Sequence, residues 1–163
     1  PARDTAKIVG LAAIKYGDLS NQATKDYIFD VDRFTSFEGN TGPYILYTIV
    51  RIKSILNRYV EAGGNLEAGE ILPASNGSEK NLMLQLSGFG SMIESAFEEK
   101  APHKICAYIY EVSNAFNSFY HETKILSEEN QAQKESYIRL LQLTKRVLET
   151  SIDLLGFEAP DKM

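Results

Sequence analysis

The sequence predicts an all-α protein, a bundle of five or six helices, and two features of the chain indicate it. Apolar residues recur at the three- to four-residue spacing of amphipathic helices over most of the 163 residues, while only one short segment alternates apolar and polar side chains. Gly, Pro, Asn and Ser separate the apolar stretches at short intervals. Apolar residues make up 44% of the chain, so the helices can share a buried core, and their short connections imply a bundle.

The first elements are a helix and an extended segment. Residues 4–15 are predicted to be helical because their apolar side chains cluster as in a packed helix. Residues 27–32 alternate apolar and polar side chains, which favours a short extended segment. Residues 38–43 then form a turn cluster rich in Gly and Asn.

A long helix follows over residues 44–61. Asn40 or Thr41 is expected to cap its first turn, where Pro43 is tolerated because the first N–H groups of a helix have no intrahelical partner. Gly63 and its neighbouring glycine end this helix.

The second half of the chain is predicted to be helical after a loop over residues 64–78. Glycines at 88 and 90 break the first helical stretch, and Gly156 closes the last, beyond which Pro160 prevents continuation. The four expected helices cover residues 78–86, 91–100, 102–119 and 127–155.

Charge and composition restrict the class of protein. The net charge of −5 argues against binding nucleic acid over the whole surface, although a local basic patch remains compatible with it. The single cysteine, Cys106, cannot form an internal disulfide, which favours the cytoplasm. No apolar run reaches the roughly 18 residues of a membrane helix, and no signal peptide is visible. We interpret the opening Pro-Ala-Arg as the start of a piece of a longer or processed chain.

The helix over residues 44–61 carries the most informative pattern. At about 100° per residue, one side of it collects apolar residues and is expected to be buried. These residues are Ile45, Leu46, Ile49, Ile52, Leu56 and Val60. The opposite side collects Tyr44, Tyr47, Arg51, Ser54 and Arg58.

A helix face that carries two tyrosines and two arginines is well suited to binding unpaired RNA. Bases of a loop can stack on Tyr rings or Arg planes, and Arg adds positive charge toward phosphate. The alternative is that Tyr44 and Tyr47 pack against another helix with their hydroxyls at the edge. The helical spacing leaves these two interpretations open.

Several motifs resemble those of arginyl-tRNA synthetases, in the same order along nearly the whole chain. The most specific is Phe-Glu-Gly-Asn-Thr-Gly-Pro-Tyr at residues 37–44, followed by Tyr47 and Arg51. Ala-Phe-Asn-Ser-Phe-Tyr at residues 115–120 is similar to the signature of that family's penultimate helix. Leu-Leu-Gly-Phe at residues 154–157, with Met163 at the end, is similar to its C-terminus.

The resemblance implies a fold, a domain division and a function. Residues 39–163 are the helical anticodon-binding domain of a class I synthetase, of the DALR type, and residues 1–38 are the lead-in after the catalytic domain. The implied partners are tRNA(Arg) and the catalytic domain, which uses ATP and Mg²⁺, and we expect a monomer. The implied contacts to the anticodon loop are Tyr44, Tyr47, Arg51, Tyr120 and Met163.

The sequence offers three further residues as basic support for that surface: Arg58 on the same helix, and Lys145 and Arg146 on the last helix. The alternative function is a non-catalytic helical adaptor that binds a protein partner through the Tyr44, Tyr47 and Arg51 face, because Tyr and Arg also dominate protein interfaces.

No catalytic, cofactor or metal site is predicted within these residues. The two signature motifs of class I synthetases are absent, as is a phosphate-binding glycine loop. His103 and His121 have no Cys or carboxylate at metal-ligand spacing, and Asp26, Asp30 and Asp32 lack the remaining features of a calcium loop. Cys106 is expected to be a buried, inert thiol. The chain by itself is therefore expected to be non-catalytic.

Overall fold

The computed structural model describes all residues from 1 to 163 and contains seven α-helices and no strand. The helices are α1 (Ala2–Leu19), α2 (Val31–Thr35), α3 (Gly42–Glu61), α4 (Gly77–Ser87), α5 (Phe89–Glu98), α6 (Pro102–Glu122) and α7 (Gln131–Leu154). The all-α prediction is confirmed, and the extra helix relative to the predicted five or six is the short α2. None of the helices has the combination of length and apolarity required to cross a membrane.

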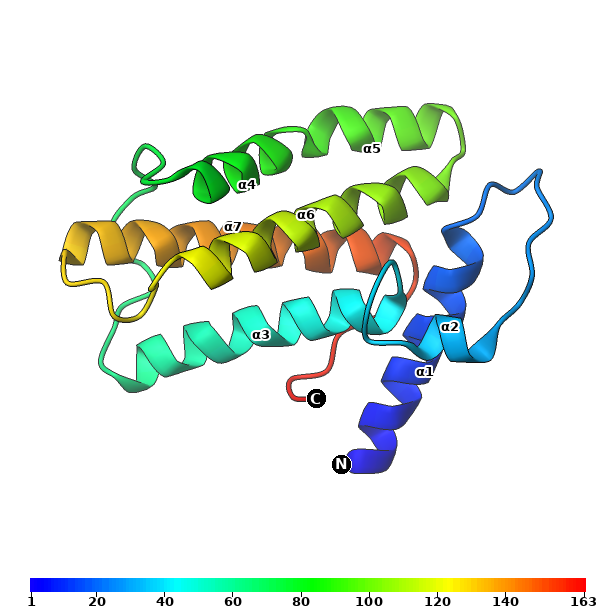
Figure 1. Cartoon of the computed structure of the whole chain (residues 1–163), viewed down its shortest axis with the longest axis horizontal. Helices are drawn as coiled ribbons and strands as arrows, with labels where there is room; N and C mark the ends of the chain where they lie inside the picture. Colours follow the sequence, from blue (N-terminus) through cyan, green and yellow to red (C-terminus); the bar gives the residue numbers. More distant parts are fainter.

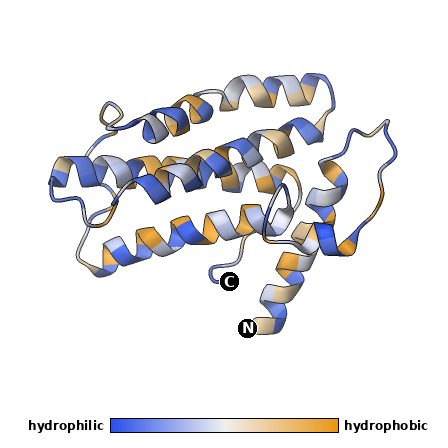
Figure 2. Cartoon of the chain, viewed as in Figure 1, coloured by the Kyte–Doolittle hydropathy of each residue, from blue (hydrophilic) through white to orange (hydrophobic).

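The three longest helices form the body of the bundle. Figure 1 shows α3 and α6 running in the same direction, with α7 antiparallel to both and α4 and α5 lying along α6. Helix α1 crosses the end of this bundle at a steep angle, beside the start of α3 (Figure 1). Blue and orange turns alternate along the long helices in Figure 2, as expected for helices that bury one side.

A single hydrophobic core of 27 buried residues joins α1, α3, α4, α6, α7 and the C-terminal segment. Ala12 and Tyr16 of α1 belong to it, together with Leu155 and Phe157 beyond α7. Residues before and after position 38 thus share one core. The assignment of residues 1–38 as a lead-in stays a prediction.

The first helices approach so closely that one position requires glycine. Gly42, the first residue of α3, lies against the backbone of α1, and a Cβ there would collide with the carbonyl of Ala12. Thr41 caps α3, and its hydroxyl accepts a hydrogen bond from the N–H of Tyr44 at 3.2 Å. Of the two predicted caps, Thr41 is therefore the correct one. The other, Asn40, instead accepts from the hydroxyl of Tyr16.

Several predicted helix starts were wrong by a few residues, and for α4 and α7 the reason is that another side chain caps the helix. Helix α4 is capped by Asn76, whose side chain accepts from the N–H of Glu79 at 2.9 Å, and not by Ser78. Helix α7 begins at Gln131 and not at 127, with Asn130 as its cap. Helix α5 begins at Phe89, so only Gly88 separates it from α4.

The segment expected to be extended is divided in two. Residues 27–30 have no regular structure, and Asp30 then caps α2 by accepting from the N–H of Arg33 at 3.1 Å. The predicted buried side of α3 is confirmed except for Val60, which is 48% exposed near the end of the helix. Ile55 and Tyr59 are buried there instead.

Candidate nucleic-acid interface

Two parallel helices bring the candidate RNA-binding residues together. Tyr44 near the start of α3 is hydrogen-bonded to Asn114 of α6, and Arg51 two turns later is hydrogen-bonded to Asn117 one turn further along α6. Tyr47 and Arg51 lie on the side of α3 opposite its buried apolar side, whereas Tyr44 packs partly against the core. We call the resulting group the α3–α6 cluster; it consists of Tyr44, Tyr47, Arg51, Tyr110, Asn114, Asn117 and Tyr120.

Arg51 is held between two aromatic rings. Its guanidinium carbon lies 4.8 Å from the ring centre of Tyr47 and 4.6 Å from that of Tyr120. One terminal nitrogen donates to the side-chain oxygen of Asn117 at 2.7 Å, and the other donates to the hydroxyl of Tyr47 at 2.9 Å. These contacts fix the plane of the guanidinium, which favours cation–π attraction to both rings.

The charge of Arg51 is not neutralised within the chain. The five ion pairs of the protein all involve other residues. A guanidinium has five N–H donors, so three of them remain after the bonds to Asn117 and Tyr47. The arrangement therefore presents a fixed cation with free donors, which is suited to phosphate or to the acceptor edge of a base.

The two tyrosines of α3 have different surroundings. The Tyr44 hydroxyl donates to Asn114 at 2.7 Å and accepts from the amide nitrogen of Asn117 at 3.1 Å. Its ring packs edge-on against Tyr110 with ring centres 5.8 Å apart. Burial raises the pKa of the Tyr44 phenol above its ordinary value of 10.0, so this group stays neutral.

Tyr47, in contrast, is 43% exposed, and its hydroxyl keeps its proton for donation after accepting from Arg51. The structure thus fits the packing interpretation for Tyr44 and the RNA-contact interpretation for Tyr47. Tyr44 packs between helices with its hydroxyl satisfied, whereas Tyr47 offers an open ring. Tyr120, half-buried on α6, completes the predicted set around Arg51.

The other predicted basic residues form no hydrogen bond or ion pair with the α3–α6 cluster. Arg58 is exposed two turns further along α3 and forms no ion pair or side-chain hydrogen bond. Lys145 on α7 is paired with Glu149 at 3.4 Å, and its neighbour Arg146 lines a shallow groove beside Glu67. Their role as basic support for the Arg51 site stays a prediction.

Met163 forms no hydrogen bond or ion pair with the cluster. It is 42% exposed on the C-terminal segment, where Lys53 contacts Asp161 at 3.6 Å and the carbonyl of Pro160 at 3.3 Å. Lys53 is two residues from Arg51, so it projects about 200° around α3 from it. The predicted role of Met163 in RNA contact stays a prediction.

The potential metal ligands of the chain do not gather at the cluster or elsewhere. No three His, Cys, Asp or Glu side chains in the chain are grouped so that they could hold a metal ion. Cys106 is fully buried in α6, and burial raises the pKa of its thiol to about 12, as expected for an inert cysteine.

Comparison with known proteins identifies the family. Residues 45–163 match the family model described as the DALR anticodon binding domain. The chain belongs to this family. The match includes most of α3 and all of α6, the two helices that form the α3–α6 cluster.

Curated relatives of this DALR domain include arginine–tRNA ligases from Agathobacter rectalis, 70% identical over 99% of the chain, and from Alkaliphilus oremlandii, 56% identical over 98%. The chain spans 28% and 27% of the length of these two relatives. Among solved structures, Thermus thermophilus arginyl-tRNA synthetase matches with a TM-score of 0.89 at 30% identity, over 98% of this chain and 27% of that one. The Plasmodium falciparum arginyl-tRNA synthetase matches with a TM-score of 0.81 at 31% identity, over 94% of this chain and 27% of that one.

Sequence reasoning missed three members of the cluster in this DALR domain: Tyr110, Asn114 and Asn117. Their spacing could have grouped them with Tyr120, because positions 110, 114, 117 and 120 are three or four residues apart and so share one face of α6. Asn side chains are common on exposed helix faces for no functional reason, however. Only their hydrogen bonds to α3 distinguish these two.

Proposed function

We propose that this DALR domain binds the anticodon loop of tRNA(Arg) as the C-terminal part of an arginine–tRNA ligase. In that enzyme the catalytic domain performs the ATP- and Mg²⁺-dependent transfer of arginine, and this domain contributes binding and no covalent chemistry. We expect the ligase to act as a monomer in the cytoplasm.

The observation that carries the proposal is the fixed, unpaired guanidinium of Arg51 between Tyr47 and Tyr120. A base that leaves the stack of the loop can lie on the exposed ring of Tyr47 while Arg51 binds phosphate or a base edge beside it. Each stacked base contributes about 1–3 kcal/mol, so two contacts give useful affinity although the protein carries a net charge of −5.

The family match and the ligase relatives support this role and do not support the alternative of an adaptor that binds a protein through the Tyr44, Tyr47 and Arg51 face. Within the site, the Arg51 guanidinium takes part in no ion pair and is therefore available to a phosphate.

The test is a binding measurement with the ligase that contains this domain. Unmodified ligase is expected to bind tRNA(Arg) more tightly than the same tRNA with a substituted anticodon loop, and Tyr47→Ala is expected to remove that difference. Affinity should fall with salt, with a slope of about −0.7 per neutralised phosphate of the single-stranded loop. Equal affinity of the unmodified ligase for both tRNAs would contradict the proposal.

A further inference from the structure

We propose that a hollow between the end of α3 and the start of α7 binds a small phosphate dianion, either inorganic phosphate or the terminal phosphoryl group of a phosphate monoester. We call it the α3–α7 hollow. The residues that line it include Arg58 and Tyr59 of α3, Leu126, and Gln131 and Lys134 of α7. The site is separate from the α3–α6 cluster, and neither its ligand nor its test depends on the binding of tRNA.

Two antiparallel helices bring the lining residues together. Helix α3 ends at Glu61 and α7 begins at Gln131, and Figure 1 shows these two helix ends at the same end of the bundle. Gly64, just beyond α3, lies so close to Tyr59 that a Cβ there would overlap the phenol ring, so the chain turns directly against this ring. The hollow has a volume of about 210 Å³, which leaves room for several water molecules or one small anion.

The lining of the α3–α7 hollow carries two cations and no anion. Arg58 is exposed and Lys134 is partly exposed, and neither takes part in any of the five ion pairs of the protein. No Asp or Glu lines the hollow. The neighbouring acid, Glu135, accepts from the amide of Gln131 at 3.0 Å and lies against Gly69. Two unpaired cations in a chain of net charge −5 make this hollow attractive to an anion.

The start of α7 adds backbone donors to the two cations. This helix has 24 residues, and its dipole places partial positive charge at its first turn. Asn130 caps the helix by accepting from the N–H of Gln133 at 3.0 Å, but the N–H groups of Gln131 and Ala132 have no acceptor within the chain. Free N–H groups at the start of a helix are a common phosphate-binding arrangement in proteins.

A buried hydroxyl without a partner is the independent sign that the hollow holds a ligand. The Tyr59 side chain is only 5% exposed and lines the hollow, yet no atom of the chain forms a hydrogen bond with its hydroxyl. In contrast, the hydroxyls of the other two buried tyrosines, Tyr16 and Tyr137, are both hydrogen-bonded. A buried hydroxyl without a partner is unfavourable, and an oxygen of a bound phosphate would supply the missing acceptor.

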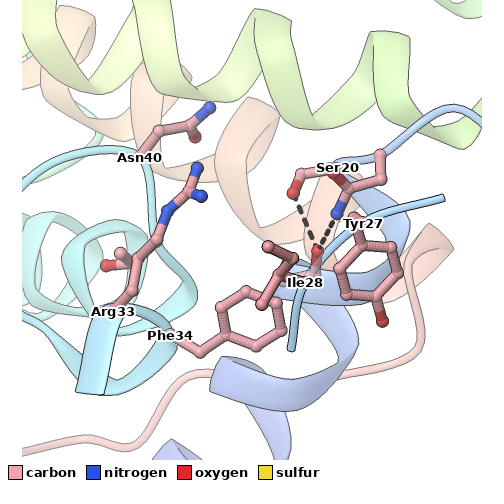
Figure 3. A pocket seen from close by; sticks show the side chains of 9 residues that line it. Ser20, Tyr27, Ile28, Arg33, Phe34 and Asn40 are labelled. Atoms are coloured by element: carbon pink, nitrogen blue, oxygen red, sulfur yellow. Dashed lines mark hydrogen bonds between the residues drawn. The ribbon is translucent and has the colours of Figure 1, made fainter. Parts of the chain in front are cut away.

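The hollow between α1 and α2, shown in Figure 3, lacks this combination of groups. Arg33 is its only cation. The hydroxyl of Ser20 and the amide of Asn21 both donate to the carbonyl of Gly17, at 3.0 and 2.6 Å, and the hydroxyl of Tyr27 donates to a carboxylate at 2.7 Å. These donors already have partners within the chain, whereas those of the α3–α7 hollow are free.

The donors of the α3–α7 hollow favour a tetrahedral dianion over other anions. The guanidinium of Arg58 can bind two oxygens side by side, and the ammonium of Lys134 adds a second positive charge. The Tyr59 hydroxyl and the start of α7 supply donors for further oxygens. Two cations balance a phosphate monoester, which carries a charge of about −1.5 to −2 at pH 7. A phosphodiester of RNA carries a single charge and has two of its oxygens bonded to sugars, and a carboxylate has only two oxygens.

The direct test is hydrogen–deuterium exchange of the full-length ligase that contains this domain, with inorganic phosphate as the probe. Amide exchange at the start of α7 is compared in phosphate and in sodium chloride of equal ionic strength. Phosphate is expected to slow exchange at residues 131 and 132 several-fold, because it accepts from their free N–H groups. The readout is local, so it does not report phosphate bound elsewhere in the ligase. Equal exchange in the two salts would overturn the proposal.

Three variants of the full-length ligase test the assigned donors. The double variant Arg58→Ala and Lys134→Ala is expected to lose the phosphate effect. The control, Lys7→Ala and Lys80→Ala, removes the same charge from exposed positions on α1 and α4 and should retain it. Tyr59→Phe should raise the phosphate concentration for half-maximal protection about tenfold or more, because one hydrogen bond to a charged group is lost. Circular dichroism checks that each variant is folded, and an equal phosphate effect in the two double variants would overturn the proposal.

A last comparison separates free phosphate from RNA and from the proposed function. Protection of residues 131 and 132 by phosphate in the absence of tRNA supports the proposal. Protection by tRNA(Arg) together with no protection by phosphate would make the hollow a contact to the RNA backbone and would overturn it. Tyr47→Ala, which removes a proposed anticodon contact, should leave the phosphate effect unchanged. Failure of the anticodon site and failure of the phosphate site are therefore distinguishable.

Discussion

Asn117 and Arg51 form the central pair of the α3–α6 cluster. The side-chain oxygen of Asn117 accepts from Arg51 at 2.7 Å, while its nitrogen donates to the hydroxyls of Tyr44 and Thr48, each at 3.1 Å. The Asn117 amide thus fixes the positions of the Arg51 guanidinium and the Tyr44 phenol relative to each other without adding a charge. A carboxylate at this position would hold Arg51 equally well but would neutralise it.

Replacement of Arg51 is expected to weaken tRNA binding far more than replacement of another arginine of the same helix. In Arg51→Ala the loss should be about 1–3 kcal/mol, that is, roughly fivefold to 150-fold in Kd, because the stacked cation is removed. Arg58→Ala is the matched control, since Arg58 is exposed and unpaired. Filter binding at two salt concentrations measures the effect, and equal losses in both variants would mean that only overall charge matters.

Asn117→Asp is expected to reduce tRNA affinity without loss of the bond to Arg51. The new carboxylate forms an ion pair with the guanidinium and cannot donate to Tyr44. The salt slope of tRNA binding should become less negative by about 0.7, the value for one phosphate contact on a single strand. Asn117→Gln, which retains the neutral amide, should recover part of the affinity. An unchanged salt slope in Asn117→Asp would show that Arg51 does not contact phosphate.

The two tyrosines of α3 should respond differently to loss of their hydroxyls. Tyr44→Phe leaves Asn114 and Asn117 without a half-buried partner, and we expect a loss of about 1–2 kcal/mol in the free energy of unfolding. Tyr47→Phe should cost much less stability, because the Tyr47 side chain is 43% exposed. Urea denaturation of both variants checks this, and equal destabilisation would contradict the distinction between a packed and an open tyrosine.

Gly42→Ala is expected to destabilise the fold by about 2 kcal/mol or more, because its Cβ meets the carbonyl of Ala12 at the α1–α3 contact. Gly10→Ala is the control within α1, where no atom lies within 4 Å of the added Cβ. That change should stabilise the helix by about 0.5–1 kcal/mol. Thermal unfolding followed by circular dichroism distinguishes the two, and similar melting temperatures would show that α1 can shift away from α3.

Cys106 should contribute to a loss of stability at high pH. Its thiol pKa is raised from 9.0 to about 12 by burial, so the folded protein holds this proton more tightly than the unfolded chain. The free energy of unfolding should therefore be independent of this group below pH 9 and decrease as the pH rises from 9 toward 12. Urea denaturation across this range should show a smaller decrease for Cys106→Ala than for the unmodified protein. Identical pH dependence would mean that the thiol titrates in the native state.

The residues of α3 show how far the sequence alone could predict the site. Helical periodicity separated Ile45, Ile49 and Ile52 from Tyr44, Tyr47 and Arg51, because residues of one helix share a face at fixed angles whatever surrounds them. The same argument failed at Val60, where the neighbouring elements no longer cover the helix. The caps of α4 and α7 were misplaced because several Asn and Ser residues lie near each start and the local sequence does not choose between them.

By itself, the sequence determined the helical class of this protein, the buried side of its long helix and the family motif around Tyr44 and Arg51. These are local properties, set by the order of side chains along one segment. Only the tertiary structure decided that Asn114 and Asn117 bond to α3, that Tyr120 lies against Arg51, and that Lys145 pairs with Glu149. Such relationships depend on how two helices distant in sequence are placed side by side, and the packing of the whole core fixes that placement.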